Sequence, residues 1–186
     1  MTITLRLAQN CDIPELEELI PLSARNLQTA YYSPAQIEGA LGTIFGVDSQ
    51  LILDGTYFVA EVNEQIVGCG GWSKRNTLFG SDQAKVASVK RLLDPRQDPA
   101  RIRAFFVHPD WSRRGIGSQI MQVCENAAVQ AGFNAIELVA TLAGEPLYSA
   151  FGYRVIKRFE VPLPNGLFLP VVGMIKKLET NALLIQ

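Results

Sequence analysis

The sequence has few of the residue types that hold metal ions or form disulfide bonds. It contains one histidine, His108, which excludes a metal site built from several histidines. Its three cysteines, Cys11, Cys69 and Cys124, are far apart and form no CxxC pair. We interpret them as reduced thiols of a cytoplasmic protein and expect no bound metal.

An excess of charge of one sign is also missing. The chain has 17 lysines and arginines against 18 aspartates and glutamates, for a formal net charge of −1. Proteins that bind nucleic acids normally carry a basic excess, so this balance argues against a nucleic-acid partner.

Long apolar runs are absent as well. No run approaches the length that spans a bilayer, and the first ten residues, MTITLRLAQN, lack the basic start and apolar core of a signal peptide. We therefore expect a cytoplasmic location and no membrane partner. With 186 residues, 48% of them hydrophobic, the chain suits one domain over residues 1–186.

Hydrophobic periodicity predicts a chain that mixes strands and helices. Apolar alternation predicts strands at 2–8, 57–62, 65–72, 101–107, 135–141, 154–163 and 168–178. Helical spacing predicts helices after Asp12, at 34–45, from 116 to Gly132, and at 145–152. Two of these starts carry capping-box patterns, D-I-P-E at 12–15 and S-P-A-Q at 33–36.

Residues 73–100 are less regular than the rest of the chain. Gly80, Asp94-Pro95 and Asp98-Pro99 interrupt the segment, and an amphipathic stretch at 84–93 predicts a short helix. We interpret the segment as an elongated excursion within the domain, long enough to serve as a lid or substrate loop.

The segment WSRRGIGS, residues 111–118, predicts an anion-binding turn between a strand and a helix. The first amides of a helix have no intrahelical partners, and glycines let phosphate oxygens approach them closely. A tight chain reversal alone would also explain two glycines. The segment is no nucleotide P-loop, and Ile120 stands where a dinucleotide fingerprint has its third glycine.

The residues around this turn resemble the acyl-CoA-binding core of the GNAT N-acetyltransferases. That family has Gln/Arg-x-x-Gly-x-Gly/Ala at a helix start, after a strand that ends in V-x-P. Gly115 and Gly117 match the small positions, and Val107 to Pro109 match the strand end. Ser112 departs from the pattern at the Gln/Arg position, where Arg113 or Arg114 could compensate.

A second segment, ATLAGEPLYSAFGY, resembles the family pattern N-x-x-A-x-x-x-Y-x-x-x-G-F/Y. Tyr148, Gly152 and Tyr153 match it, whereas Thr141 replaces the usual Asn and Gly144 the usual Ala. The order of elements agrees across essentially the whole chain. The resemblance implies an α/β (α+β) fold, with a mixed, mostly antiparallel sheet of about seven strands flanked by helices and splayed at the acetyl-CoA site.

The resemblance also implies how acetyl-CoA would be held. The backbone amides from Arg113 to Ser118 would bind its pyrophosphate, and a backbone N–H near Val107 would bind the thioester carbonyl. Other residues would line the cosubstrate. The full set of expected binding residues is Phe105, Phe106, Val107, Arg113, Arg114, Gly115, Ile116, Gly117, Ser118, Thr141 and Tyr148.

The resemblance implies that the Tyr148 hydroxyl protonates the departing CoA thiolate; packing of a helix against the sheet is the structural alternative. The general base stays open. Glu61 and Glu137 lie on predicted strands and are candidates, His108 is another, and a water chain to bulk solvent is a further possibility.

The function implied is acetyl transfer from acetyl-CoA to a primary amine of a small molecule or peptide, by direct attack on the thioester. Tyr31 and Tyr32 fall where the family forms its acceptor entrance, although packing would equally explain them. The alternative is a non-catalytic acyl-CoA-binding sensor or interaction module of the same fold. The C-terminal hairpin, with Asn165-Gly166 at its turn, could contribute an edge to a homodimer.

Overall fold

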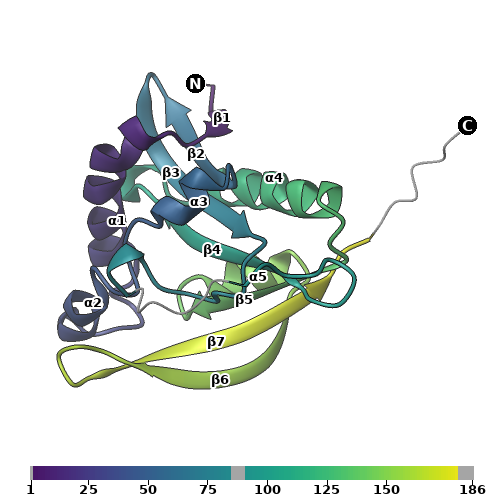
Figure 1. Ribbon diagram of the computed structural model, residues 1–186. Helices are drawn as coiled ribbons and strands as arrows, with labels where there is room; N and C mark the ends of the chain where they lie inside the picture. The colour runs from purple at the N-terminus through teal and green to yellow at the C-terminus, as the bar shows by residue number, and fades with distance from the viewer. Residues whose placement is uncertain (1, 85–90, 180–186) are drawn as a thin grey trace, which may run out of the picture.

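The computed structural model describes residues 2–84 and 91–179, which form a sheet of seven strands in the order β1-β2-β3-β4-β5-β7-β6 (Figure 1). The strands are β1 (Thr4–Leu7), β2 (Tyr57–Val62), β3 (Gln65–Ser73), β4 (Ala100–Val107), β5 (Ala135–Thr141), β6 (Arg154–Pro162) and β7 (Phe168–Lys177). The α-helices are α1 (Ile13–Leu27), α2 (Pro34–Ala40), α3 (Ser49–Leu53), α4 (Ile116–Gln130) and α5 (Glu145–Ala150). Short 3-10 helices occupy Asn10–Asp12, Asp82–Ala84 and Pro109–Trp111.

Neighbouring strands are antiparallel except β4 and β5, which are parallel. These two strands pair only where Ala100–Ile102 face residues 136–138. Both continue, to Val107 and Thr141, without further pairing to each other, so they splay apart along their second halves. The mixed, mostly antiparallel sheet and its splay confirm the expected fold.

Helices cover both faces of the sheet (Figure 1). On one face α1, α2 and α3 bury side chains such as Leu16, Ile37 and Leu51. On the other face α4 and α5 bury Ile120 and Tyr148. The splay between β4 and β5 thus opens between two packed layers, which hold its walls in place.

Strand β4 contains a bulge. Its register with β3 shifts between Cys69 and Gly71, and Ala104 has a left-handed φ of 55°. The Tyr57 hydroxyl donates a hydrogen bond to the Ala104 carbonyl at 3.0 Å and helps to hold this conformation. Bulges bend a strand and redirect its side chains. The bulge thus occurs just where β4 leaves β5.

The second predicted helix ends earlier than its spacing indicated. The capping box is confirmed: the Ser33 N–H donates to Gln36 Oε1 at 3.0 Å and the Gln36 N–H to Ser33 Oγ at 3.2 Å. However, Leu41 is extended and Gly42 has a φ of 81°, so α2 ends at Ala40 instead of residue 45. The short helix α3 was not predicted.

The capping box predicted at 12–15 is wrong. Asp12 occupies the N-cap position of α1, but its side chain caps no amide of that helix; its Oδ2 accepts the Gln9 N–H at 2.7 Å and pairs with Arg6 Nη1 at 2.7 Å. Glu15 Oε1 accepts the Ile66 N–H at 2.7 Å instead of reaching back along its own helix. Asp12 thus bonds to groups that precede it in the chain, and Glu15 bonds to a strand 51 residues away, instead of to each other's amides.

The two ends of the 73–100 excursion run side by side. The Asn76 N–H donates to the Arg91 carbonyl at 3.1 Å, and the Leu93 N–H to the Lys74 carbonyl at 2.8 Å. The helix expected at 84–93 falls mainly on 85–90, outside the described residues; residues 91–93 are not helical.

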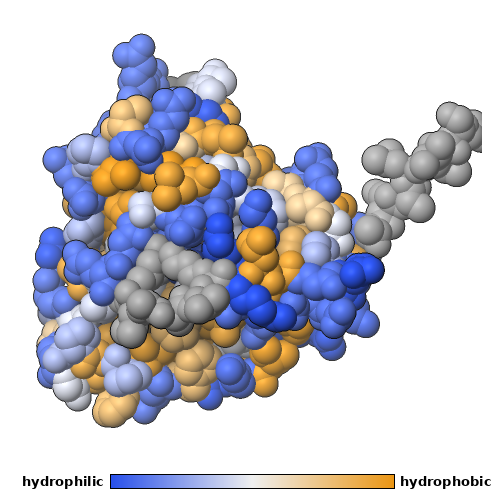
Figure 2. Space-filling view, viewed as in Figure 1, coloured by the Kyte–Doolittle hydropathy of each residue, from blue (hydrophilic) through white to orange (hydrophobic). Residues whose placement is uncertain are grey.

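Apolar and polar residues are interspersed on the face seen in Figure 2. Large exposed apolar side chains come from separate elements, such as Leu53 of α3, Ile156 of β6 and Phe168 of β7. Over residues 2–84 and 91–179, no helix is both long and apolar enough to cross a membrane.

Candidate functional site

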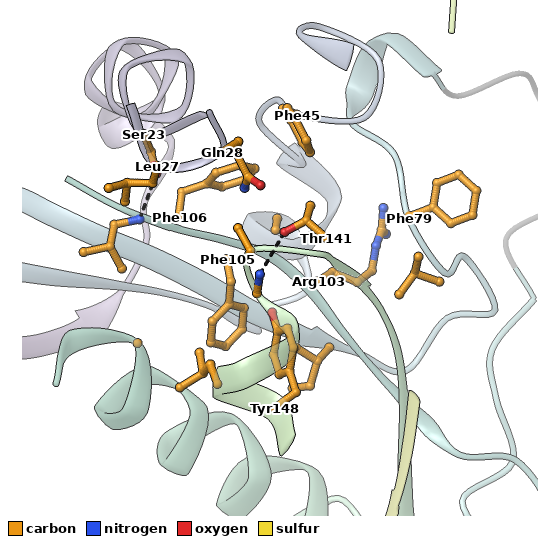
Figure 3. Close-up of a pocket in the computed structure, with 18 of the residues that line it drawn as sticks. Ser23, Leu27, Gln28, Phe45, Phe79, Arg103, Phe105, Phe106, Thr141 and Tyr148 are labelled. Atoms are coloured by element: carbon orange, nitrogen blue, oxygen red, sulfur yellow. Dashed lines mark hydrogen bonds between the residues drawn. The ribbon is translucent and has the colours of Figure 1, made fainter. Parts of the chain in front are cut away.

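A cavity of about 650 Å³ lies where β4 and β5 diverge (Figure 3). Residues from both layers line it: α1 lies on one side of β4, and α5 with the first turn of α4 lies on the other. Its lining includes Ser23, Leu27, Gln28, Phe45, Leu78, Phe79, Arg103, Phe105, Phe106, Val107, Trp111, Ser112, Arg113, Gly115, Ile116, Gly117, Ser118, Val139, Thr141, Leu147 and Tyr148.

One end of the cavity is the N-terminus of α4. The N-cap residue, Gly115, is left-handed with a φ of 82°, and no side chain caps the helix. The first turn carries no acidic residue, so its amides keep the partial positive charge of a helix N-terminus. A Cβ at Gly117 would lie 3.2 Å from Leu147 Cδ2, so this glycine lets α4 pack closely on α5. Bare amides at a cavity wall fit phosphate oxygens.

The two arginines before the glycines differ in position. Arg113, left-handed at a φ of 62°, is exposed and lines the cavity mouth. The Arg114 guanidinium instead lies 4.8 Å from the centre of the Trp111 ring, in a cation–π contact. Arg113 is therefore the arginine that borders the cavity, and Arg114 braces Trp111 behind it.

The bulged end of β4 supplies the cavity wall. Phe105 packs edge-on against Tyr148, with ring centres 6.2 Å apart, whereas Phe106 packs against Phe45 at 6.0 Å. The Val107 N–H donates a hydrogen bond to Ser23 Oγ of α1 at 3.2 Å. The amide expected to hold a thioester carbonyl therefore already has a side-chain partner.

Tyr148 lies on α5 below the two strands, with its hydroxyl directed toward them (Figure 3). The ring is 8% exposed and lies edge-on between Phe105 and Tyr153. Burial raises the pKa of its hydroxyl above the ordinary value, so the group stays protonated at neutral pH. Thr141 Oγ1 accepts the Gly144 N–H at 3.1 Å and shapes the turn that leads into α5.

The three side chains considered as general bases lie elsewhere. Glu61 accepts from Arg6 Nε at 2.9 Å, Glu137 Oε2 accepts from Arg101 at 2.7 Å, and neither borders the cavity. The His108 Nδ1 accepts the Asp110 N–H at 3.2 Å and caps a 3-10 turn. The structure thus gives all three of these groups structural partners.

Away from the glycine turn, much of the cavity lining is apolar. Leu27, Phe45, Leu78 and Phe79 belong to the lining, together with Gln28. Gln28 Oε1 is buried and has no hydrogen-bond partner among the described residues. No Asp, Glu or His is among the described residues that line the cavity.

Arg103 of β4 is a deeply buried charged side chain in the cavity lining. Its Nη1 lies 2.6 Å from Asp48 Oδ2, with 3% and 0% of the two side chains exposed. Its Nη2 donates to the Gly80 carbonyl at 2.6 Å and so fixes the excursion to β4. Burial lowers the pKa of Arg103, and the Asp48 carboxylate opposes this shift.

The tyrosines expected at an acceptor entrance do not line the cavity. The Tyr32 ring is 3% exposed, and its hydroxyl donates to the Pro170 carbonyl at 2.7 Å and accepts the Leu142 N–H at 2.9 Å. Tyr31 is exposed. Tyr32 therefore joins the turn between α1 and α2 to β7 and to the residue that follows β5, as the packing explanation supposed.

Among the site residues that had no part in the sequence prediction, three are polar: Ser23, Gln28 and Arg103. Ser23 continues the buried stripe Leu16, Leu19, Ile20 and Ala24 of α1, so a polar residue on an apolar helix face was a signal. Arg103 interrupts an apolar strand, which is a similar signal. Over the described ranges, no group of three or more His, Cys, Asp or Glu side chains is placed to hold a metal.

Residues 53–155 match the acetyltransferase (GNAT) domain family. Among solved structures, the chain is similar to a GCN5-related N-acetyltransferase from Rhodopseudomonas palustris, at 22% identity and a TM-score of 0.70 over 96% of this chain and 97% of that chain. It is also similar to a PaiA N-acetyltransferase from Thermoplasma acidophilum in complex with coenzyme A, at 14% identity and a TM-score of 0.64 over 95% and 99%.

A ribosomal-protein-alanine N-acetyltransferase from Brucella melitensis is similar at 16% identity and a TM-score of 0.62, over 94% of this chain and 99% of that chain. At such identities these likenesses show a shared fold. A search of curated proteins found no match.

Proposed function

The chain belongs to the GNAT family of acetyltransferases, and from this premise we propose that it moves an acetyl group from acetyl-CoA to a primary amine of a small molecule or peptide. The observation that carries the proposal is that one cavity joins the uncapped amides of α4 to the Tyr148 ring. Acetyl-CoA would need an anion site for its phosphates, which the α4 amides offer, and a proton donor for its leaving sulfur, which Tyr148 offers.

The donor half of the cavity would hold acetyl-CoA through the backbone. Amides from Arg113 to Ser118 would bind the pyrophosphate, where left-handed Gly115 leaves the approach open. Phe105, Phe106 and Thr141 would border the arm that carries the thioester. When bound, acetyl-CoA supplies a thioester carbonyl that is open to attack by an amine.

Tyr148 would act on the leaving sulfur. The amine nitrogen forms a bond to the carbonyl carbon, the carbon–sulfur bond breaks, and the thiolate that departs takes up a proton. A buried tyrosine keeps its proton at neutral pH because burial raises its pKa, so its hydroxyl can donate to sulfur.

The amine must lose a proton, and we propose that water carries it to bulk solvent. Glu61 and Glu137 are each held by an arginine away from the cavity. A lysine-like amine has a pKa near 10.4, so only about one molecule in a few thousand is uncharged at pH 7. The free amine would therefore be the species that enters.

The acceptor would carry an apolar group next to its amine. Leu27, Phe45, Leu78 and Phe79 are apolar members of the cavity lining, and the Gln28 Oε1 in the same lining offers a hydrogen-bond acceptor. Burial of an apolar group against such a wall is favourable at roughly 25 cal/mol per Å². Among primary amines of matched pKa, those with an alkyl or aryl group should therefore give the higher kcat/KM.

The experiment that tests the function is thiol release from acetyl-CoA against a panel of amines. Tyr148→Phe removes only the hydroxyl and should lower kcat about 100-fold. Tyr153→Phe is a matched control, because Tyr153 is also buried and touches Tyr148 but does not line the cavity. It should keep the wild-type rate.

Two results would contradict this proposal. Tight CoA binding without turnover on any amine would favour the non-catalytic binding module. Equal rates for Tyr148→Phe and the wild type would remove the tyrosine from the mechanism while leaving acetyl transfer intact.

A further inference from the structure

Ser23 is a buried polar residue on the apolar face of α1. It is 4% exposed, and its neighbours on that face, Ile20 and Ala24, are fully buried. Ser23 also lines the cavity, across the splay from Tyr148 (Figure 3). A serine in such a place loses hydration and needs hydrogen-bond partners in return.

One partner is the backbone of β4. The His108 N–H donates to the Val67 carbonyl of β3 at 2.9 Å. Because N–H groups alternate in direction along a strand, the N–H of Val107 points away from β3. It meets Ser23 Oγ at 3.2 Å. Ser23 Oγ thus accepts a hydrogen bond from the amide expected to bind the thioester carbonyl.

The hydroxyl hydrogen of Ser23 has no acceptor among the described residues. Serines inside helices often donate to the carbonyl four residues earlier, which here is that of Leu19. No such bond forms. A hydroxyl that already accepts one hydrogen bond and borders a cavity can donate its hydrogen to a ligand there.

We propose that the Ser23 hydroxyl donates a hydrogen bond to the carbonyl oxygen of the acetyl-CoA thioester. Val107 N–H, Ser23 Oγ–H and the carbonyl oxygen then form a chain in which each donor points to the next acceptor. When the amine attacks, the carbonyl electron pair moves to oxygen, and Ser23 stabilises the negative charge that develops. When the carbon–sulfur bond breaks, the pair returns to restore the carbonyl, and Ser23 keeps its proton throughout.

The two hydrogen bonds of this chain reinforce each other. Accepting the Val107 N–H makes the Ser23 hydroxyl a stronger donor, because linked hydrogen bonds polarise one another. Ser23 itself is buried, and a donor held in a buried place stabilises charge more than it would in water. Ser23 is therefore a catalytic residue, and Val107 is the residue that positions and polarises it.

The inference rests on the proposed function, and two measurements distinguish a failure of the Ser23 hydrogen bond from a failure of acetyl transfer. The first is the infrared carbonyl stretch of acetyl-CoA labelled with carbon-13 at the acetyl carbonyl and bound to the protein, measured without an acceptor amine. The second is kcat with the best amine of the panel, beside the dissociation constant of CoA, which lacks the carbonyl.

The variant is Ser23→Ala, which is nearly isosteric and favoured in a helix. Its matched control is Ser73→Ala, because Ser73 is also buried and its Oγ also accepts a backbone N–H, that of Arg75 at 3.1 Å, away from the cavity. We expect the bound carbonyl stretch to lie at lower frequency in the wild type and in Ser73→Ala than in Ser23→Ala. We also expect Ser23→Ala to lower kcat about 100-fold with unchanged CoA affinity.

An unchanged carbonyl frequency in Ser23→Ala overturns the inference, whatever happens to kcat, and returns the role to Val107 N–H alone. A frequency difference in a protein that acetylates no amine supports the Ser23 hydrogen bond but overturns the proposed function. A wild type that does not bind acetyl-CoA overturns both.

Discussion

At the scale of single residues, two separate features favour a glycine at position 115: its backbone conformation and its place at the start of α4. Its φ of 82° lies in the left-handed region, which costs a residue with a side chain about 1–2 kcal/mol. It also stands at the N-terminus of α4, where any Cβ would project into open space rather than against protein atoms. The effect of a side chain on ligand binding can therefore be measured separately from its effect on backbone strain.

Gly115→Ala should weaken CoA binding at least about tenfold, because a methyl group blocks the approach of phosphate oxygens to the amides. Gly166→Ala is the control: Gly166 has the same φ of 82° and equally open surroundings, but it lies in the β6–β7 turn. Isothermal titration should find its CoA affinity unchanged. Equal weakening in the two variants would mean that backbone strain alone is responsible.

The raised pKa of Tyr148 leads to a prediction for how kcat/KM depends on pH. Burial raises its pKa above the ordinary value of about 10, so its proton is present at neutral pH and is lost only in alkali. Between about pH 7 and 9, log kcat/KM should therefore rise about one unit per pH unit for an alkylamine acceptor, following the free amine, with no descending limb. Rate profiles of the wild type and Tyr148→Phe should have the same shape; a descending limb within this range that disappears in the variant would contradict the assignment.

At the scale of elements, β4 gathers the parts of the site. It pairs with β5 for three residues and bulges at Ala104. Beyond the bulge it stays paired with β3, through Phe106 and Val107, while its other edge no longer pairs with β5. The buried pair of Arg103 and Asp48 anchors this strand to the loop before α3 and, through Gly80, to the excursion.

Asp48→Ala should lower the free energy of unfolding by about 3–5 kcal/mol, because it removes the ion-pair partner of the buried Arg103 guanidinium. The double variant Asp48→Ala/Arg103→Met removes both charges and should be more stable than the single one. Urea unfolding measures both. Removing Glu38 from its exposed pair with Arg25 should change the midpoint little. A double variant less stable than Asp48→Ala would contradict this account.

At the scale of the whole molecule, the sheet ends at β6, whose outer edge has no partner strand among the described residues. Val155 and Ile156 are 43% and 50% exposed along it. An exposed edge strand with apolar side chains is a surface on which a second copy can pair. The homodimer expected from the C-terminal hairpin stays a prediction of this kind.

If β6 pairs with a second copy, sedimentation should show a dimer whose dissociation is promoted by Ile156→Lys, because a charge there opposes burial of the edge. Lys157→Ala is a control on the same strand and should not promote dissociation, because it adds no charge to the edge. A wild type that sediments as a monomer at all accessible concentrations would contradict the prediction.

Much of the secondary structure could be predicted from local patterns. Apolar alternation found all seven strands to within a few residues, and S-P-A-Q capped α2 as expected. The predictions failed where other contacts intervened: Arg6 and Gln9 bind the Asp12 carboxylate, Glu15 caps the Ile66 N–H of β3, and Leu41 turns the chain before residue 45.

The positions of Gly115, Gly117 and Tyr148 in the site could be predicted from the sequence, because the spacing of these residues along the chain is itself the motif. The general base could not be placed in this way. Glu61 and Glu137 were candidates by type, but pairing with Arg6 and Arg101 depends on strand register, which a list of residue types does not contain.

The sequence by itself determined the order of elements, the glycine turn before α4 and the family to which these belong, since each depends on residues near one another in the chain. Only the tertiary structure decided that β4 leaves β5 after Ile102, that Arg103 lies buried beside Asp48, and that Ser23 meets the Val107 amide. These contacts join segments that are dozens of residues apart, and their geometry is set by how the layers pack on the sheet, which no local pattern specifies.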